Sequence, residues 1–181
     1  MSLENLWAGW RHDYIQEATE RARAAGASDH AACVFCRLAA SGPPSLDNLI
    51  VWRGEKSFVV LNAYPYGSGH VLVLPLRHVG ALGDLDEPEA AEIWAATRQA
   101  VTAIETAYQP DGLNMGANLG HAAGAGIPDH VHLHVLPRWS GDTNFMTSVA
   151  STRVMPETLQ ASWIKLRKAW PGSQRGVGPE S

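Results

Sequence analysis

The segment HVHLHVLP (residues 130–137) alternates histidine with aliphatic residues over its first six positions. In a β-strand, successive side chains point to opposite faces, so the three histidines would share one face and the aliphatic residues the other. Same-face neighbours are then about 6.6 Å apart, because a strand rises about 3.3 Å per residue. Histidine is a poor choice for a merely solvent-facing position three times over, and the segment therefore indicates a chemical site on one face of a strand.

Three imidazoles in a row suit two kinds of chemistry. They can form a metal cage, since two histidines spaced by one residue are a common way for a strand to present ligands. Alternatively, a neutral imidazole attacks phosphorus while a neighbouring imidazolium stabilises charge or protonates a leaving oxygen. The loop GHAAGAGIPD (120–129) comes directly before the segment, and its small residues allow backbone N–H groups to approach an anion. This loop favours phosphoryl chemistry, and a metal on His130, His132 and His134 remains the alternative.

The rest of the chain predicts a small mixed fold around this strand. Runs rich in valine and leucine, separated by turn-like segments, predict further strands at 48–53, 57–62, 70–75 and 113–119. Helix-forming composition and apolar residues at three- and four-residue steps predict helices at 11–25, 86–108 and 156–170. We therefore expect an α+β fold: an antiparallel sheet of about five strands, a long central helix, and N- and C-terminal helices. The final residues, 172–181, are expected to form a flexible tail.

Length and charge exclude several classes of protein. With 181 residues the chain suits one domain, which we place at 1–181 with its core at about 5–170. Fourteen basic against eighteen acidic residues give a net charge of −4 without a basic block, so we expect no nucleic-acid polymer as partner. Residues 1–14 lack the apolar core of a signal peptide, and no apolar run approaches the roughly 18 residues of a membrane span. A cytoplasmic protein with no membrane partner is the expectation.

The two cysteines of the chain, Cys33 and Cys36, form a CVFC motif. Two cysteines are too few for a secreted disulfide framework, and their spacing is typical of a metal knuckle or of a redox pair in a reducing compartment. No thioredoxin-like βαβ pattern, which would favour the redox pair, surrounds Cys33. The motif by itself leaves both explanations open.

Three motifs together resemble the histidine triad (HIT) family of nucleotide hydrolases and transferases. They are CVFC (33–36), NAYPYGSGHVLVLPLRHV (62–79) and HVHLHVL (130–136), which occur in the family's order. The segments LENLWAGWRHDYI (3–15) and PRWSGDTNFM (137–146) are more similar to the actinobacterial-type diadenosine tetraphosphate phosphorylase branch. The resemblance covers about residues 5–170 and implies a HIT-like fold in a single domain, assembled as a homodimer.

The resemblance implies catalytic roles for three histidines. His132 matches the central histidine, the nucleophile that forms a covalent nucleotidyl-histidine, and His134 matches the third, which contacts the phosphate and the leaving group. His70 matches the outlying histidine that supports the third one, although a histidine that opens a strand can also be purely structural.

Substrate-binding residues also follow from the resemblance. The matching positions are Asn62 for the ribose hydroxyls, Phe35 and Leu38 for the base pocket, and Asn118 with Gly126 for the phosphate-side wall. Some have a plainer explanation, because Asn62 can cap a turn before Pro65 and the two apolar residues can be packing residues. Asn144, in the segment GDTNF, is a further candidate for stabilising charge at the phosphate.

The loop before the histidine segment departs from the family pattern. Many relatives carry Gln-Ser where this chain has Gly126-Ile127. A leaving-group proton supplied by that serine hydroxyl must then come from elsewhere, or backbone N–H groups must contribute more of the binding. The departure argues against fast hydrolysis of phosphoramidates.

The resemblance also implies a metal site beside the histidines. Metal-bearing relatives ligate zinc with a CxxC pair, a histidine after a strand-plus-proline segment and the first histidine of the triad, which here are Cys33, Cys36, His78 and His130. Two thiolates and two imidazoles make a closed tetrahedral site, which cannot activate water, so the expected zinc is structural and no organic cofactor is expected. A dithiol redox pair remains the rival explanation for the cysteines.

The resulting hypothesis is two-step nucleotidyl transfer. His132 attacks the α-phosphorus of a dinucleoside polyphosphate such as diadenosine tetraphosphate, and orthophosphate or water then releases the nucleotide from the histidine. Two alternatives stay open: a hydrolase of nucleoside phosphoramidates or adenylylated conjugates with the same nucleophile, and a catalytically weak nucleotide-binding protein that retains the triad.

Overall fold

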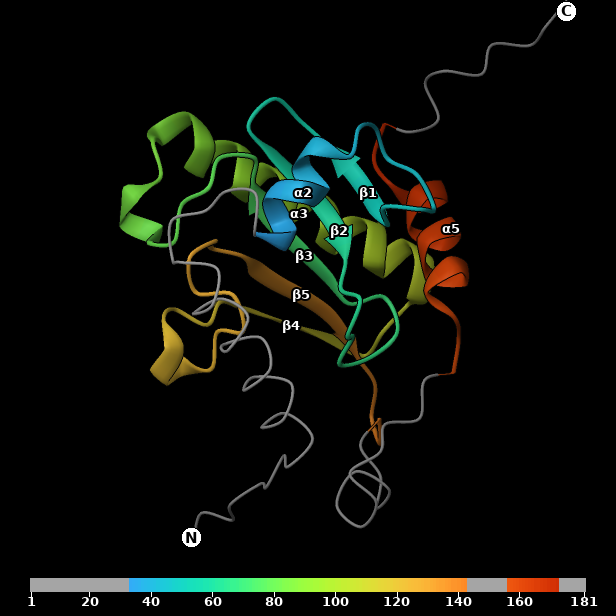
Figure 1. Cartoon of the computed structure of the whole chain (residues 1–181). Helices are drawn as coiled ribbons and strands as arrows, with labels where there is room; N and C mark the ends of the chain where they lie inside the picture. Colours follow the sequence, from blue (N-terminus) through green and yellow to red (C-terminus); the bar gives the residue numbers. More distant parts are fainter. Residues whose placement is uncertain (1–32, 143–155, 173–181) are drawn as a thin grey trace, which may run out of the picture.

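The structure is a computed structural model that describes residues 33–142 and 156–172 (Figure 1). The predicted N-terminal helix at 11–25, the predicted tail at 172–181 beyond its first residue, and Asn144 lie outside the described residues. These predictions therefore remain predictions.

One antiparallel sheet of five strands forms the centre of the described chain. The strands are β1 (Ile50–Arg53), β2 (Ser57–Leu61), β3 (Val71–Pro75), β4 (Gly112–Gly116) and β5 (Leu133–Arg138), in the spatial order β1-β2-β3-β5-β4. All four neighbouring pairs are antiparallel, which confirms the predicted sheet. In the pairing of β3 with β5, Leu72 lies opposite His134.

The histidine segment enters this sheet later than its alternation predicts, because β5 begins only at Leu133. Two residues ahead of the strand use their backbone groups elsewhere: Val131 N–H donates to the carbonyl of Val79, and the His130 carbonyl accepts a side-chain hydrogen bond. The first two histidines therefore lie just before the strand.

Within residues 33–142 and 156–172, three α-helices flank the sheet: α2 (Val34–Ala40), α3 (Glu87–Tyr108) and α5 (Leu159–Ala169), with short 3₁₀ turns at Leu82–Asp84 and His121–Ala123. The predicted central helix is confirmed as α3, which begins after Asp86 with a reciprocal capping box to Glu89. The predicted C-terminal helix is present as α5, and it starts three residues later than expected because Thr158 caps it through the Ala161 N–H.

Each face of the sheet packs against a different helix. Figure 1 shows α2 in front of the sheet and α3 behind it. The larger core lies on the α3 side and joins the helix residues Ile93 and Ile104 to the strand residues Val59, Val73 and Val135. The smaller core lies on the α2 side and contains Phe35, Phe58, Val60, Leu72 and Leu74. Since His134 is paired with Leu72, the histidine face is the α2 face.

The two edges of the sheet are finished differently. At the β1 edge, the carbonyls of Ile50 and Val51 accept hydrogen bonds from Trp163 Nε1 and Arg167 of α5, each at 2.8 Å. At the β4 edge, by contrast, Met115 is 52% exposed. Side chains of α5 thus cover the first edge, while the second edge faces outward.

Candidate active site

His132 is held in one tautomer by the backbone beside it. The ring is 7% exposed, and its Nδ1 lies 2.8 Å from the His130 carbonyl oxygen. A carbonyl only accepts hydrogen bonds, so Nδ1 carries the proton and the lone pair of the neutral ring is on Nε2. His132 therefore presents Nε2 as a base or nucleophile.

The surroundings of His132 also keep the ring neutral. Burial lowers the pKa of His132 from its ordinary value, since the charged form loses its hydration, and the hydrogen bond to the His130 backbone opposes this only in part. An imidazole with a lowered pKa is largely unprotonated at neutral pH. The side chain is thus in the form that nucleophilic attack requires.

His70 and His134 form a hydrogen-bonded pair, and both carry their proton on Nε2, the nitrogen that is unprotonated in His132. The backbone N–H of Tyr66 donates to His70 Nδ1 at 3.0 Å, so the proton of neutral His70 is on Nε2. That nitrogen lies 2.9 Å from His134 Nδ1, to which it donates. The proton of neutral His134 is consequently on Nε2, where it can be donated in a hydrogen bond.

The three histidines predicted to be catalytic lie together. The rings of His132 and His134 are 5.1 Å apart and meet at 62°, and His70 is 5.1 Å from His134. His132 has an acceptor nitrogen and His134 a donor nitrogen, so the pair offers a nucleophile beside a hydrogen-bond donor. This arrangement suits displacement at phosphorus, in which one oxygen leaves as another group attacks.

Asn62 lies at the beginning of the loop that leads to His70. Its Oδ1 accepts the N–H of Tyr64 at 3.0 Å, and its Nδ2 is 3.4 Å from His70 Nδ1. The turn-capping role is therefore present in the structure, and the side chain also lies beside the histidine pair. Binding of ribose hydroxyls by Asn62 remains a prediction.

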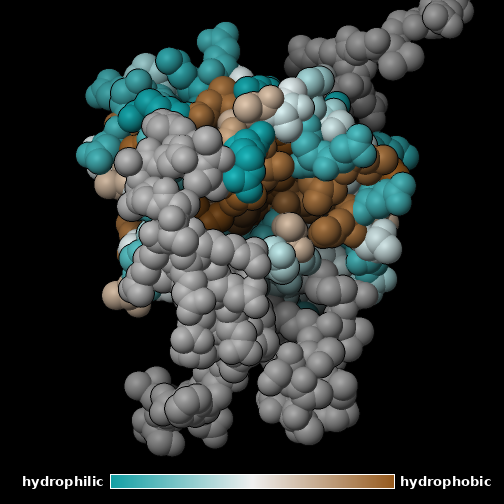
Figure 2. Space-filling view, in the orientation of Figure 1, coloured by the Kyte–Doolittle hydropathy of each residue, from teal (hydrophilic) through white to brown (hydrophobic). Residues whose placement is uncertain are grey.

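The predicted base-pocket residues belong to the smaller core. Phe35 is 7% exposed, and its ring lies 5.5 Å from His130 and 5.1 Å from His132. Leu38, one turn later on α2, packs partly buried against the same cluster. Figure 2 shows that apolar residues gather in a hollow on this face of the molecule. Contact of Phe35 or Leu38 with a base remains a prediction.

The glycine-rich loop reaches the same core through Ile127, which packs partly buried against it. Asn118 contacts the loop, since its Nδ2 donates to the Gly124 carbonyl at 3.4 Å. Gly124 has a φ of +83°, a conformation that favours glycine. Gly126 lies in this loop with the backbone exposed in part. The structure thus brings Asn118 and the loop together, and their contact with phosphate remains a prediction.

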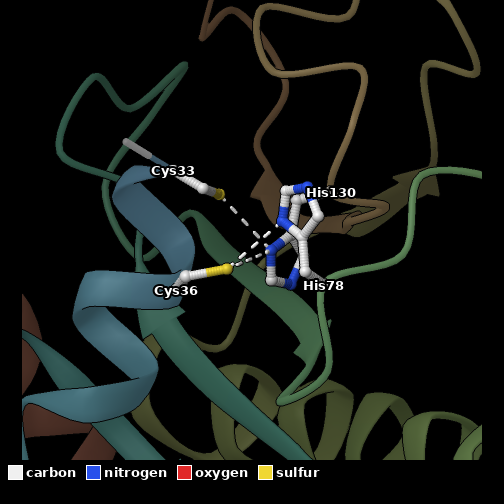
Figure 3. A group of neighbouring side chains, drawn as sticks. All are labelled: Cys33, Cys36, His78 and His130. Carbon is white, nitrogen blue, oxygen red and sulfur yellow. Dashed lines mark hydrogen bonds between the residues drawn. The ribbon is translucent and has the colours of Figure 1, made fainter. Parts of the chain in front are cut away.

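Four metal-ligating side chains converge beside His132. Cys33 precedes α2, Cys36 lies in its first turn, His78 follows β3, and His130 comes just before β5 (Figure 3). Their donor atoms all lie within 4.8 Å of one another. Figure 3 shows the two sulfur atoms and the two rings pointing toward one common point.

Three of the spacings between these donors are close to those of a tetrahedral metal site. Cys33 Sγ is 3.5 Å and Cys36 Sγ 3.6 Å from His130 Nδ1, and Cys36 Sγ is 3.2 Å from His78 Nδ1. Bonds near 2.0–2.1 Å to nitrogen and 2.3 Å to sulfur place tetrahedral ligands about 3.3–3.8 Å apart. The geometry therefore fits zinc.

The protonation of the cluster also fits a cation. His130 Nε2 lies 3.0 Å from the Pro75 carbonyl, which fixes the proton there and leaves the Nδ1 lone pair for a metal. Burial and the neighbouring Cys33 thiol raise the pKa of Cys36 to about 11. Such thiols lose their protons readily only to a positive charge placed between them.

Comparison with known proteins agrees with this geometry. Residues 44–141 match the model of the HIT domain. The chain belongs to the HIT family. An AP-4-A phosphorylase from Mycobacterium tuberculosis is 38% identical over 171 residues, which cover 93% of this chain and 85% of that protein. The asymmetrical bis(5'-nucleosyl)-tetraphosphatase of Schizosaccharomyces pombe is 34% identical over 93 residues, about half of each chain.

Solved structures of the HIT family share the fold. A Zn-bound histidine triad family protein from Mycobacterium smegmatis superposes with a TM-score of 0.62 at 30% identity, over 78% of this chain and 94% of that one. A hypothetical histidine triad nucleotide-binding protein from Sulfolobus tokodaii gives a TM-score of 0.61 at 27% identity, over 76% and 91% of the two chains. None of the helices within 33–142 and 156–172 combines the length and apolar character that a membrane span needs.

Two features near the site have no counterpart in the sequence analysis. Tyr66 stacks on the pair of His70 and His134, and Arg77 binds Glu89 through two hydrogen bonds of 2.8 and 2.7 Å directly before the donor His78. Arg77 and Glu89 are twelve residues apart and lie on different elements, so no local pattern connects them. A tyrosine four residues before His70 was visible, but only the fold shows what it covers.

Proposed function

We propose that this HIT protein cleaves dinucleoside polyphosphates of the diadenosine tetraphosphate type through a covalent nucleotidyl-histidine at His132. The observation that carries the proposal is the opposite polarity of two adjacent rings, an acceptor Nε2 on His132 and a donor Nε2 on His134. The dinucleoside polyphosphate relatives support the substrate class. The core residues Phe35 and Leu38, with Asn62, are the proposed contacts of the transferred nucleoside.

The first step forms the covalent intermediate. Nε2 of His132 attacks the α-phosphorus, a P–N bond forms, and the P–O bond to the leaving nucleotide breaks with its electron pair staying on oxygen. His134 donates a hydrogen bond from Nε2 to that developing oxyanion, and His70 fixes the ring through its own Nε2–H. Loop N–H groups near Gly126 and the side chain of Asn118 are proposed to hold the phosphate oxygens, together with Asn144.

The second step releases the nucleotide. An oxygen of orthophosphate attacks the phosphorus of the adduct, the P–N bond breaks, and its electron pair returns to His132 Nε2. From diadenosine tetraphosphate this gives ADP beside the ATP released first, whereas water as acceptor gives AMP. We propose orthophosphate as the acceptor, supported by the phosphorylase similar over most of the chain. ADP formation that requires added phosphate would support this choice, and AMP at the same rate without phosphate would exclude it.

We infer that Cys33, Cys36, His78 and His130 hold a structural zinc ion, because their spacing and protonation fit one. When bound, zinc supplies a fixed positive charge that keeps both thiols ionised and the four ligands in place. The His130 backbone carbonyl then stays aligned with His132 Nδ1. Thiolate ligands of this kind suit a reducing compartment, so the proposal includes a cytoplasmic location.

We also propose that the protein is a homodimer that pairs through β4 and α3. Trp94 of α3 and Met115 of β4 are 54% and 52% exposed, and both line a hollow of about 630 Å³. The other sheet edge is covered by α5, so β4 is the edge suited to a second copy. A charge in an apolar interface is costly, so Trp94→Glu should yield monomers by light scattering. Ile164→Glu, at an exposed apolar site of α5, should stay dimeric, and a monomeric wild type would refute the proposal.

The experiment that tests the enzymatic proposal is intact-protein mass spectrometry. The full chain is mixed briefly with diadenosine tetraphosphate without phosphate and quenched, and we expect an added adenylyl group that maps to His132. His132→Ala should show no adduct and no turnover while it still binds nucleotide. Turnover by His132→Ala at the wild-type rate, or an adduct on another residue, would contradict the mechanism.

A further inference from the structure

We propose that Tyr66 is a positioning residue for the leaving-group side of the reaction: it clamps His70 and His134 so that the donor Nε2 of His134 faces the departing oxygen. The inference rests on the proposed function and deepens it, because it assigns control of leaving-group stabilisation to a residue outside the histidine motif.

Tyr66 contacts the histidine pair in two independent ways. Its backbone N–H donates to His70 Nδ1 at 3.0 Å, which sets the tautomer of His70 and through it that of His134. Its ring lies 4.8 Å from the His70 ring at 33° and 5.8 Å from the His134 ring at 15°. One aromatic side chain therefore covers both imidazoles while its own backbone orders their protons.

The loop that carries Tyr66 is held from both sides. At its ends, Asn62 N–H donates to the His70 carbonyl at 3.0 Å, and His70 N–H donates to the Gly67 carbonyl at 3.3 Å. Directly before His70, Gly69 has a φ of +75°, and a Cβ there would lie only 2.7 Å from the ring of Tyr108. The Tyr108 hydroxyl in turn donates to Glu157, ahead of α5. The loop that carries Tyr66 thus packs against Tyr108 of α3 where it reaches His70.

The chemical consequence concerns the bond that breaks. As the P–O bond opens, negative charge gathers on the leaving oxygen, and the Nε2–H of His134 stabilises it by a hydrogen bond that strengthens in the transition state. A ring that rotates away loses this bond. The loss is larger for a leaving oxygen that holds charge poorly, because such an oxygen depends more on the donor.

Tyr66 is distinguishable from a residue that only packs the loop. A packing role would lower the stability of the fold and slow all substrates alike. A positioning role changes the balance between substrates and the protonation pattern of two named rings, and it leaves His132 unchanged. The ring itself is the active part of the side chain, so phenylalanine should replace it.

The first measurement needs no turnover. Nitrogen-15 spectra of the imidazoles in the zinc-loaded full chain should show the proton on Nε2 in His70 and His134 and on Nδ1 in His132. Tyr66→Leu keeps the backbone N–H, but without the ring packed on both imidazoles this N–H is no longer held against His70 Nδ1. We therefore expect the two nitrogen shifts of His70, and those of His134, to move toward each other as tautomers mix, while His132 keeps its pattern. Tyr66→Phe and the control Tyr64→Leu, at a 63% exposed tyrosine on the same loop, should match wild type.

The second measurement compares two leaving groups in the first turnover, the 4-nitrophenyl ester and the poorer phenyl ester of AMP. In Tyr66→Leu the rate of phenol release should fall about 10-fold more for the phenyl ester than for the nitrophenyl ester. Tyr66→Phe should restore both rates, and Tyr64→Leu should change neither.

The outcomes separate this inference from the proposed function. If wild type forms the His132 adduct but Tyr66→Leu slows both esters equally with unchanged tautomers, the clamp is refuted and the function stands. If Tyr66→Phe fails as Tyr66→Leu does, the ring contact is refuted as the cause. If wild type forms no adduct, the proposed function fails, and this inference, which rests on it, falls as well.

Discussion

His130 and His132 are two residues apart, and they carry their protons on opposite nitrogens. His130 donates from Nε2 to the Pro75 carbonyl and turns Nδ1 toward the cysteines, whereas His132 donates from Nδ1 to the His130 carbonyl and keeps Nε2 for reaction. The same side chain is thus suited to the proposed metal ligand or to the proposed nucleophile according to which backbone carbonyl takes its proton. The backbone around the histidine segment therefore determines which nitrogen of each ring is available.

The two histidines are also mechanically connected. The His130 carbonyl is the hydrogen-bond acceptor of His132. Phe35, which lies between Cys33 and Cys36 in the sequence, packs its ring against both imidazoles. A metal held by Cys33, Cys36 and His130 would therefore also fix the surroundings of His132, the proposed nucleophile. Substitutions at His132 and at the metal-binding cluster should therefore affect different properties of the protein, and by different amounts.

The largest expected effect is at His132. In His132→Gly, turnover should fall more than about 10³-fold because no other described group replaces Nε2, and free imidazole should restore part of it. Initial rates with and without imidazole measure both effects. His130→Gly, the matched change at the metal-binding cluster, should not respond to imidazole, and rescue of both variants would erase the distinction.

A smaller loss is expected at His70, which acts through His134. In His70→Ala, the donor to His134 Nδ1 is gone, so kcat should fall about 10²-fold with little change in KM. Steady-state kinetics measure the two constants. The exposed His121→Ala is the control, and a rise in KM with kcat intact would show instead that His70 serves binding.

At the metal-binding cluster, we expect a smaller loss of turnover than at His132 or His70, and a larger loss of stability. In His78→Ala, the site loses one of four ligands, so we expect zinc below stoichiometric content, a lower unfolding midpoint and a kcat reduced about 10-fold. Elemental analysis, thermal unfolding and kinetics on one preparation measure these. Unchanged zinc content in this variant would show that His78 is not a ligand, and unchanged kcat after zinc loss would break the link to His132.

The smallest effect on turnover is expected at Glu89, whose pKa is lowered to about 2, chiefly by the hydrogen bond from Arg77. A carboxyl with a lowered folded-state pKa stabilises the fold fully above its ordinary value of 4.5 and loses that contribution as the pH falls toward 2. Glu89→Gln should therefore be about 2 kcal/mol less stable at pH 7 and approach the wild type as the medium is acidified.

Urea unfolding of both metal-free proteins from pH 7 to pH 3 measures this difference, with a chelator present so that zinc loss does not contribute. Turnover of zinc-loaded Glu89→Gln at pH 7 should stay within about 2-fold of wild type. A stability gap that is constant with pH would show that the Glu89 charge contributes nothing to the fold.

The sheet and the long helix could be predicted because their patterns are local. The valine-rich strands alternate or run apolar over several residues, and α3 repeats its apolar residues over 22 positions with an Asp86 cap. Helix α2 was missed because its seven residues are too few for a period to show. The late start of β5 was missed because the carbonyl of His130 bonds a side chain instead of a neighbouring strand.

The residues of the site also fall into those that a local motif predicts and those that only the fold brings together. The four predicted metal donors and the three histidines predicted to be catalytic follow from motifs, and the structure brings each set together. Tyr66 and the Arg77–Glu89 pair act through contacts between distant elements, which depend on how loops cross the finished sheet. A motif names the groups that react, and only the fold shows which neighbours hold them.

The donor set joins chain positions that are far apart, since Cys33 and His130 are separated by 97 residues. During synthesis the cysteine pair emerges early with only two ligands to offer, and the fourth ligand arrives after β3 and α3 are already made. Under the proposed zinc site, firm retention of an ion would thus mark a chain whose strand β5 has docked. If the proposed zinc is bound, its stoichiometry in a preparation should therefore also report the fraction of molecules that have completed their assembly.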